Sequence, residues 1–362
     1  MTTRRLPTLF GLVLLGIMIS LGGCTSTGSG KLSFRMPRVD AENLQNLVWP
    51  SSPETPRYAF IGHIYGESNA GDSGAGRSSV SRFLHALAGT DIREKGLDNL
   101  VQPQQITSDN AGRIYVADAG RQAVFLFDEA QGEMGIWDET SLDIPFLSPV
   151  GVAFGGNSVW VSDAELGLVY RFTPNGALID TIGQGMLSRP TGISFDDEQQ
   201  RLFVSDTGAD NVKLFDASSG ELIGIWSHSG SEDGTLNHPT FIHYRFGRLY
   251  VADSLNARIV IFDDQGNHVE TLGHRGLYVG NFSRPKGVGV DSDNNIYVTE
   301  SYYDYLLIYN SQGELLMSIG GSGAAPGKFS QPTGLWVDEH DRVFVSDMLN
   351  SRVSVFQYLG SD

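Results

Sequence analysis

The 362-residue sequence predicts an all-β protein, a six-bladed β-propeller. One unit recurs along the chain, as RIYVADAGRQAVFLFD at 113–128, RLFVSDTGADNVKLFD at 201–216, RLYVADSLNARIVIFD at 248–263 and RVFVSDMLNSRVSVFQ at 342–357. Six copies open with a proline, and successive prolines are separated by 46, 41, 49, 46 and 47 residues. These prolines are Pro103, Pro149, Pro190, Pro239, Pro285 and Pro332. A period in the forties with several short strands is typical of propeller blades.

The first residues indicate an export signal over 1–23. Arg4 and Arg5 precede an apolar run, Leu9 to Leu21, that is short for a membrane span. The run ends in LGGC, which resembles the lipobox of bacterial lipoproteins, so we expect Cys24 to be acylated; the alternative is an ordinary export signal with an incidental cysteine. Range 24–47 would then be the lipidated N-terminus and a flexible tether. Thr25 after the cysteine resembles an outer-membrane address, facing the periplasm or the cell exterior.

Charge and cysteine content exclude several kinds of chemistry. Cys24 is the only cysteine, so its acylation would leave no thiol for a disulfide, a catalytic thiolate or a cysteine-bound zinc. The formal net charge is −17, and an acidic surface repels phosphate backbones and anionic headgroups. We therefore expect no nucleic-acid partner, membrane contact through the lipid anchor alone, and a monomer.

Each copy in the propeller range 48–362 predicts four antiparallel strands. In the third copy they are GISF (192–195), LFVSD (202–206), VKLFD (212–216) and ELIGIW (221–226), with the polar turn DDEQQ after the first. An apolar residue precedes every proline by three positions. These six are Leu100, Phe146, Leu187, Leu236, Phe282 and Phe329.

The last copy ends after its third strand, which would leave an unpaired edge in the ring. Residues 57–64, RYAFIGHI, alternate like a fourth strand and have no blade of their own, so we predict that they close the ring. An insertion at 66–96 begins with the Gly/Ser-rich segment ESNAGDSGAGRSS. Val80, Phe83, Leu84 and Leu87 follow at helical spacing and predict a short helix that packs near the first blade.

These units resemble NHL repeats. The resemblance rests on Pro-x-Gly, on the hydrophobic-V-x-D strand end, on Asn-x-Arg at Asn256 and Asn350, and on the junction GGSGAAPGKFSQPTGL at 320–335. It covers 57–64 and about 97–358, and it implies an NHL-type six-bladed propeller in a bacterial lipoprotein. It is specific for the fold and says little about activity.

Two residue sets are candidates for metal binding, although we expect no cofactor. One carboxylate ends the second strand of every copy and could collect Ca²⁺, but a carboxylate there also accepts backbone N–H bonds and fixes the loop, which is the preferred interpretation. This set is Asp118, Asp163, Asp206, Asp253, Glu300 and Asp347. The other set could hold Zn²⁺ and comprises His228, His238, His243 and His274, in or beside the fourth copy.

The sequence contains few motifs that are typical of enzymes. In the amidating lyases, a related propeller family, zinc-binding histidines come from different blades. The matching positions here hold no such triad; they are Gln105, Gly151, Gly192, Phe241, Gly287 and Gly334. No G-x-S-x-G motif occurs, so no catalytic residue is assigned.

Positions that vary among the copies are free for recognition. We expect the segments around the prolines to converge at the channel mouth, and tyrosines near arginine and histidine favour contact. The predicted binding residues are Arg189, His238, Arg284, Lys286, Gln331, Tyr302 and Tyr303. The sequence thus predicts a lipid-anchored envelope module that binds an envelope protein or exported ligand through loops on one face. Two alternatives remain: loops whose aromatic residues only pack locally, and a metal-dependent lyase or lactonase that uses the central channel.

Overall fold

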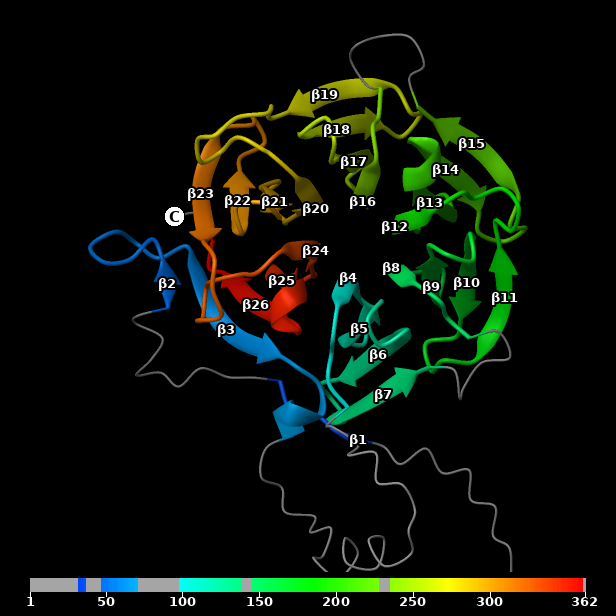
Figure 1. Cartoon of the computed structure of the whole chain (residues 1–362), viewed down its shortest axis with the longest axis horizontal. Coiled ribbons are helices and arrows are strands. Elements are labelled where there is room, and N and C mark those ends of the chain that lie inside the picture. The colour runs from blue at the N-terminus through cyan, green and yellow to red at the C-terminus, as the bar shows by residue number, and fades with distance from the viewer. Residues whose placement is uncertain (1–31, 37–46, 71–97, 139–144, 228–234, 361–362) are drawn as a thin grey trace, which may run out of the picture. The chain divides into compact units, whose positions relative to one another are not determined.

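The computed structural model confirms the predicted six-bladed β-propeller: six sheets surround a common axis (Figure 1). It describes residues 32–36, 47–70, 98–138, 145–227 and 235–360. The expected signal peptide, Cys24 and the predicted helix over 80–87 lie outside these residues. No helix within the described ranges is long and apolar enough to cross a membrane.

Blades 1 to 3 each contain four strands that follow one another in the chain, with the first strand beginning at a repeated proline; blade 1 has a fifth strand, described below. The strands are β4 (Pro103–Ser108), β5 (Arg113–Asp118), β6 (Ala123–Asp128) and β7 (Glu133–Trp137); β8 (Pro149–Gly155), β9 (Ser158–Asp163), β10 (Leu168–Phe172) and β11 (Leu178–Ile182); and β12 (Pro190–Asp196), β13 (Arg201–Asp206), β14 (Asn211–Asp216) and β15 (Leu222–Trp226). Proline is tolerated at the first residue of a strand because no ladder N–H is needed there.

Blades 4 and 5 repeat this order, and blade 6 takes its outer strands from the N-terminal part of the chain. The strands are β16 (Pro239–Arg245), β17 (Arg248–Asp253), β18 (Arg258–Asp263) and β19 (His268–Leu272); β20 (Pro285–Val290), β21 (Ile296–Glu300), β22 (Tyr305–Tyr309) and β23 (Leu315–Gly320); and β24 (Pro332–Val337), β25 (Arg342–Asp347), β26 (Arg352–Tyr358), β3 (Tyr58–Ile64) and β2 (Val48–Trp49).

The ring closes through β3, as the sequence predicts. β3 pairs antiparallel with β26 from Ile64 opposite Val353 to Tyr58 opposite Tyr358. In Figure 1 this blue strand lies beside the red C-terminal strand. The pairing satisfies the edge of β26, which would otherwise expose its N–H and C=O groups.

Blade 1 gains a strand that the sequence analysis did not expect. β1 (Leu32–Ser33) pairs with β7, although residues 32–36 lie inside the range 24–47 assigned to the tether. Phe34 is buried and its ring centroid is 4.8 Å from that of Phe127. The contacts of the propeller therefore begin at Leu32 within the described residues.

Three short 3₁₀ helices complete the described elements: η1 (Glu67–Ala70), η2 (Thr207–Ala209) and η3 (Met348–Asn350). η1 occupies the start of the insertion, where a loop was expected. The Asn69 side chain explains the turn, because its Oδ1 accepts the N–H groups of Tyr65 and Gly66 at 2.6 and 3.1 Å.

The hydrophobic core consists of six layers, one between each pair of neighbouring blades. Each layer contains one of the six apolar residues that precede the prolines. All six are buried, and Phe282 and Phe329 are fully inaccessible. Burying such a side chain contributes about 1.5–3 kcal/mol, so the repeat places one strong contact in every layer.

Hydrogen bonds also join neighbouring blades near the axis. At five of the six junctions between blades, side-chain hydroxyls donate to backbone carbonyls of the next blade, and two of these junctions have a second such bond, from Thr191 to Thr240 and from Thr240 to Lys286. With the donor first, the other pairs are Ser162 with Thr191, Thr207 with Pro239, Ser254 with Pro285, Thr299 with Thr333, and Thr333 with Pro103. Between blades 1 and 2, Gln105 Oε1 accepts the Val152 N–H at 3.2 Å. These bonds join the first strands and the ends of the second strands of the six blades into a closed polar belt.

Candidate functional site

The strand order defines two faces of the propeller. Because strands alternate in direction, the loops after the second and fourth strands of each blade lie at one end, here called the loop face. The hairpins after the first and third strands lie at the other end, here called the hairpin face. The loop face is the face that the sequence analysis selected for binding.

Buried carboxylates at the ends of the second strands shape the loop face. Asp163 accepts the backbone N–H groups of Leu147, Ser148, Glu165 and Leu166 at 2.8–3.0 Å. All six members of this set have no accessible surface. Each of the six accepts backbone N–H groups of the loop that precedes its blade, and all but Asp206 also accept a bond from the loop that follows their own strand.

Three of the six carboxylates also bind a cation of the third strand. Asp206 pairs with Lys213, Asp253 with Arg258 at 2.8 Å, and Asp347 with Arg352 at 2.7 Å.

Asp118 has no such cation, and burial raises its pKa against the opposing effect of the Val101 and Gln102 N–H groups. The described residues contain no group of three or more His, Cys, Asp or Glu side chains placed to hold a metal. These contacts support the structural interpretation of the set.

Four predicted binding residues occupy equivalent places on the loop face, directly before a first strand. Arg189, His238, Arg284 and Gln331 are all exposed there. The His238 and Gln331 N–H groups each donate at 2.7 Å to an aspartate of the preceding blade, Asp210 and Asp304 respectively. Their backbones are thus held by the neighbouring blade while their side chains face solvent.

Blade 5 brings the remaining predicted residues together. The Tyr302 and Tyr303 rings are perpendicular, with centroids 4.9 Å apart. Lys286 is half-buried, and burial, followed by the charge of Arg284, lowers its pKa. Neither Arg284 nor Lys286 forms an ion pair within the described ranges.

A neighbouring apolar segment was not among the predicted binding residues. Leu277, Tyr278 and Val279, in the loop between β19 and β20, are 86%, 83% and 56% exposed. They line a cavity of about 170 Å³ together with Tyr303. We call Leu277, Tyr278, Val279, Tyr302 and Tyr303 the tyrosine cluster. The signal was present in the sequence as three consecutive apolar residues between glycines, in GLYVG.

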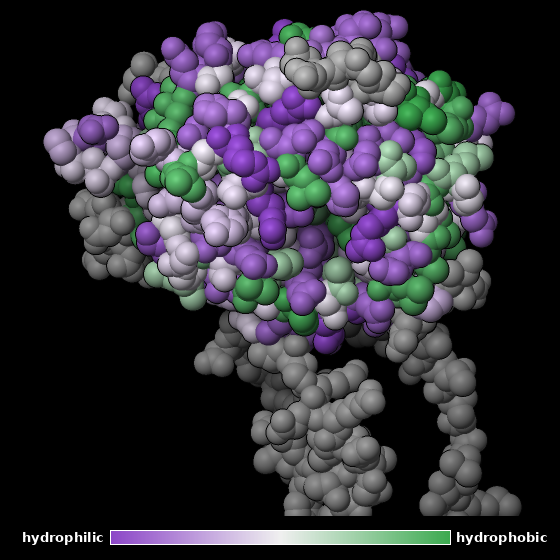
Figure 2. Space-filling model, turned by 45° about the horizontal axis from the view of Figure 1, so that its top comes forward, coloured by the Kyte–Doolittle hydropathy of each residue, from purple (hydrophilic) through white to green (hydrophobic). Residues whose placement is uncertain are grey.

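Exposed apolar side chains are distributed unevenly over the propeller. Of the eighteen large exposed ones among the described residues, nine lie on the loop face and two on the hairpin face. The other seven lie on fourth strands. The nine are Val101, Leu147, Met186, Leu255, Leu277, Tyr278, Val279, Tyr302 and Leu349. Figure 2 shows a mainly hydrophilic surface with separate hydrophobic groups, some at the right edge where Figure 1 places β11 and β15.

The axis offers a second candidate region, relevant to the channel alternative. Gln105 reaches from blade 1 to blade 3, where its side chain bonds the Ile193 N–H and C=O at 3.0 and 2.8 Å. His243 is 4% exposed, and burial, with the charge of Arg245, lowers its pKa to about 3. Its Nε2 has no hydrogen-bond partner among the described protein atoms.

The histidine set is not assembled into one group. His238 and His274 are exposed on the loop face, whereas His243 is buried near the axis. His228 lies outside the described residues.

Comparisons with known proteins place the chain in a structural class. A family model described as a six-bladed β-propeller matches residues 290–360. A protein of unknown function from Bacteroides thetaiotaomicron is 17% identical with a TM-score of 0.57, covering 71% of this chain and 70% of that chain.

Two further solved structures have known partners or activities. A streptogramin B lyase is 13% identical with a TM-score of 0.53, covering 70% of this chain and 78% of that chain. A chain of a nidogen/laminin complex is 16% identical with a TM-score of 0.51, covering 60% of this chain and 79% of that chain. At these identities the likeness shows the fold alone: the chain is a six-bladed β-propeller.

Proposed function

We propose that the chain is a lipid-anchored binding module of the bacterial envelope that holds a protein partner or an exported ligand on its loop face. The concentration of exposed apolar side chains on that face carries the proposal. Exposed apolar groups that gather on one side of a soluble domain mark interaction sites. The rigid belt beneath them keeps the loops in fixed positions.

The tyrosine cluster forms the centre of the proposed contact. Tyrosine and arginine are enriched at interfaces because they combine a large apolar area with hydrogen-bonding groups. Arg284 and Lys286 lie beside the cluster in sequence and carry positive charge without a carboxylate partner in the described structure. A partner with an apolar anchor and nearby acidic groups fits this composition.

The anchor follows from the lipobox resemblance. Acylation of Cys24 would hold the propeller at the outer membrane through several acyl chains, which bind a bilayer firmly. The similarity of the repeats to NHL repeats supports the same proposal, because the loops rather than the scaffold then determine specificity. Replacement of Cys24 by alanine should release the protein from envelope membranes into the soluble fraction.

Site-specific crosslinking tests the contact face. A photoreactive amino acid in place of Tyr278 in the full-length protein should crosslink one major species in the envelope. The same residue in place of Ile225, which is 54% exposed on β15, is the matched control and should not. Leu277→Ser combined with Tyr302→Ser should reduce the crosslink at least tenfold. An identical crosslinked species from position 225 would contradict the assignment of the face.

The channel alternative, a metal-dependent lyase or lactonase, is favoured by one observation: His243 is a buried imidazole near the axis whose Nε2 has no hydrogen-bond partner among the described protein atoms. Metal analysis of the purified full-length protein separates the two functions. Stoichiometric Ca²⁺ or Zn²⁺ that raises the melting temperature would favour the enzyme.

A further inference from the structure

Side chains of the protein fill the spaces between blades on the hairpin face. Between blades 1 and 2, Arg113 Nη1 donates to Asn175 Oδ1 at 2.9 Å, and Tyr115 donates to the Pro174 carbonyl at 3.0 Å. Both acceptors belong to the hairpin between the third and fourth strands of blade 2. Between blades 3 and 4, Arg201 donates in the same way to the Asp264 carbonyl at 3.1 Å.

At three further junctions, an arginine or tyrosine side chain also forms a hydrogen bond to the next blade. The contacts are Arg171 with the Ala217 carbonyl at 3.3 Å, Tyr297 with Tyr58 at 3.2 Å, and Arg342 with Glu129 at 3.0 Å. In each case an arginine or a tyrosine bonds to the outer part of the next blade. Five of the six junctions are thus closed by the protein itself.

The junction between blades 4 and 5 differs, because its arginine bond goes to the innermost strand of the next blade: Arg245 donates to the Val290 carbonyl of β20 at 2.6 Å, and no bond to the outer part of blade 5 is seen among the described residues. Asp109, Asp196 and Asp338 orient the first arginine of the second strand in blades 1, 3 and 6. Blade 4 has no aspartate there, because its first hairpin is Arg245-Phe246-Gly247. Arg248 occupies the matching strand position but forms no ion pair among the described residues.

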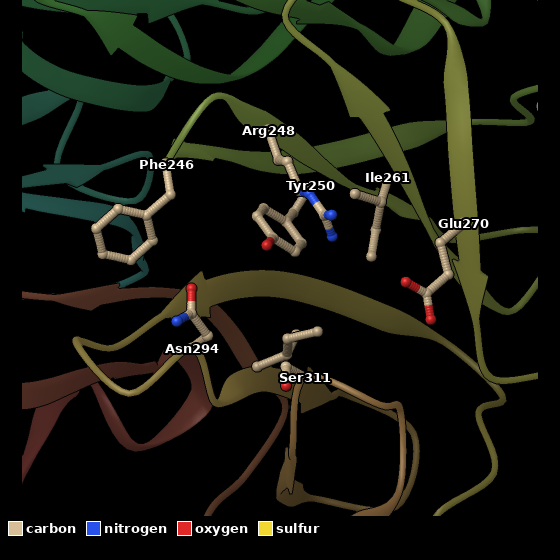
Figure 3. Close-up of a pocket in the computed structure, with 8 residues that line it drawn as sticks. Phe246, Arg248, Tyr250, Ile261, Glu270, Asn294 and Ser311 are labelled. Carbon is tan, nitrogen blue, oxygen red and sulfur yellow. The ribbon is translucent and has the colours of Figure 1, made fainter.

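A cavity of about 380 Å³ remains at this junction, here called the open slot. Its floor is apolar, since Tyr250, Ile261 and Ile296 are 4%, 1% and 4% exposed. Figure 3 shows Arg248 and Glu270 beside this floor, with Asn294 and Ser311 contributed by blade 5. Ligand sites usually have volumes of roughly 300–1,000 Å³ and combine an apolar lining with a few polar groups.

The open slot is lined by one positively and one negatively charged side chain that do not pair with each other. Arg248 and Glu270 both line the cavity, yet they form no ion pair with each other. Burial raises the pKa of Tyr250, whose hydroxyl also bonds to Arg248. The slot therefore presents a guanidinium and a carboxylate to the same small volume, above a buried apolar surface. Phe246, 59% exposed, stands at the rim.

We propose that the open slot binds a small zwitterion with an apolar side chain, of the size of an amino acid or a dipeptide. The carboxylate of the ligand takes the place of the hairpin oxygens that bond to Arg113, Arg201 and Arg342 at the closed junctions. Its ammonium group pairs with Glu270, and its side chain covers Tyr250 and Ile261. The slot is on the opposite face from the tyrosine cluster, so this site does not depend on the proposed function.

Calorimetry and thermal shift on the full-length protein in detergent test the proposal. The compounds are leucine, phenylalanine and the dipeptide Leu-Leu, with N-acetyl-leucinamide as the uncharged counterpart. At least one zwitterion should bind and raise the melting temperature. The uncharged counterpart should bind at least tenfold more weakly, because charge-assisted hydrogen bonds to Arg248 are lost.

Two variants locate the site. Arg248→Ala should weaken binding at least tenfold. Ser311→Glu should abolish it, because the new carboxylate fills the slot as Glu129 fills the junction beside Arg342. Ser218→Glu, on the corresponding hairpin of blade 3, adds the same charge at a closed junction and should leave binding unchanged. The proposal is overturned if none of the three zwitterions binds the wild-type protein, or if Ser311→Glu binds them as well as wild type.

Discussion

His243 on β16 of blade 4 packs edge-on against Trp336 on β24 of blade 6, with 5.5 Å between the ring centroids. The two blades are not neighbours in the ring. Trp336 Nε1 also donates to Ser108 Oγ of blade 1 at 2.9 Å. Three blades therefore meet near the axis, and the imidazole, only 4% exposed, has little contact with water to stabilise a charge.

The buried imidazole should make the protein sensitive to acid. Burial lowers the pKa of His243 from 6.5 to about 3, so the unfolded state takes up a proton that the folded state refuses between these values. Stability therefore falls as pH decreases through this window, by about 1.4 kcal/mol per unit well below pH 6.5. Between pH 7 and 4.5, wild type should lose roughly 2.5 kcal/mol more unfolding free energy than His243→Gln does.

Denaturant unfolding at the two pH values measures this difference. His63, whose pKa is also lowered to about 3 by burial, is present in both proteins, so its effect cancels. Equal pH dependence in wild type and His243→Gln would show that His243 is not the titrating group.

Close approach of the blades at the axis should make one glycine irreplaceable. A Cβ at Gly151 would overlap the Thr191 carbonyl oxygen of the next blade and lie 2.5 Å from Ser162 Oγ. Because both atoms belong to the polar belt, neither can move freely. Gly151→Ala should cost about 3 kcal/mol or more.

Gly224 on β15 provides the matched control for this substitution. A Cβ there would meet Leu214 at an ordinary 3.6 Å. Gly224→Ala should be neutral or stabilise by about 0.5 kcal/mol. Similar melting temperatures for the two variants would contradict tight contact at the belt.

The buried carboxylates below the loop face should contribute mainly to the stability of the fold rather than to ligand binding. Asp163→Ala leaves four part-buried N–H groups without their acceptor and should cost roughly 3–5 kcal/mol. Asp216→Ala is the control, because Asp216 accepts the Ser218 and Ser219 N–H groups in an exposed turn and should have a much smaller effect. Thermal unfolding distinguishes the two outcomes. A large calcium-dependent stabilisation of wild type that Asp163→Ala abolishes would instead indicate a metal site.

Most of the fold could be predicted because the same pattern of strands occurs in six copies of the repeat. Six prolines mark six first strands, and the missing fourth strand of the last copy identifies Tyr58–Ile64 as the closing strand. Leu32–Ser33 could not be assigned, since two residues carry no periodicity and their position depends on burial of the neighbouring Phe34.

The candidate site was less predictable because it depends on departures from the repeat. The proline junctions led to Arg189, His238, Arg284 and Gln331, whose equivalent positions follow from the alignment of the copies. The open slot arises because blade 4 has no aspartate before Arg248. The effect of this difference is seen only when the slot is compared with the closed junctions of the other blades. The absence of a side chain produces no sequence motif from which a site could be predicted.

Ring closure by β3 should dominate the overall stability of the propeller. Phe60 is 3% exposed, and its ring contacts Phe356 of β26 at a centroid distance of 5.5 Å. Phe60→Ala should cost about 3–5 kcal/mol. Ile225→Ala on an exposed fourth strand should change stability by less than about 0.5 kcal/mol.

Hydrogen exchange measures ring closure directly. In wild type, the amides of 58–64 should be as protected as those of β26. In Phe60→Ala, both strands should lose protection together. Fast exchange of 58–64 beside a protected β26 in wild type would mean that the ring does not depend on this strand, because protection reports the free energy of opening.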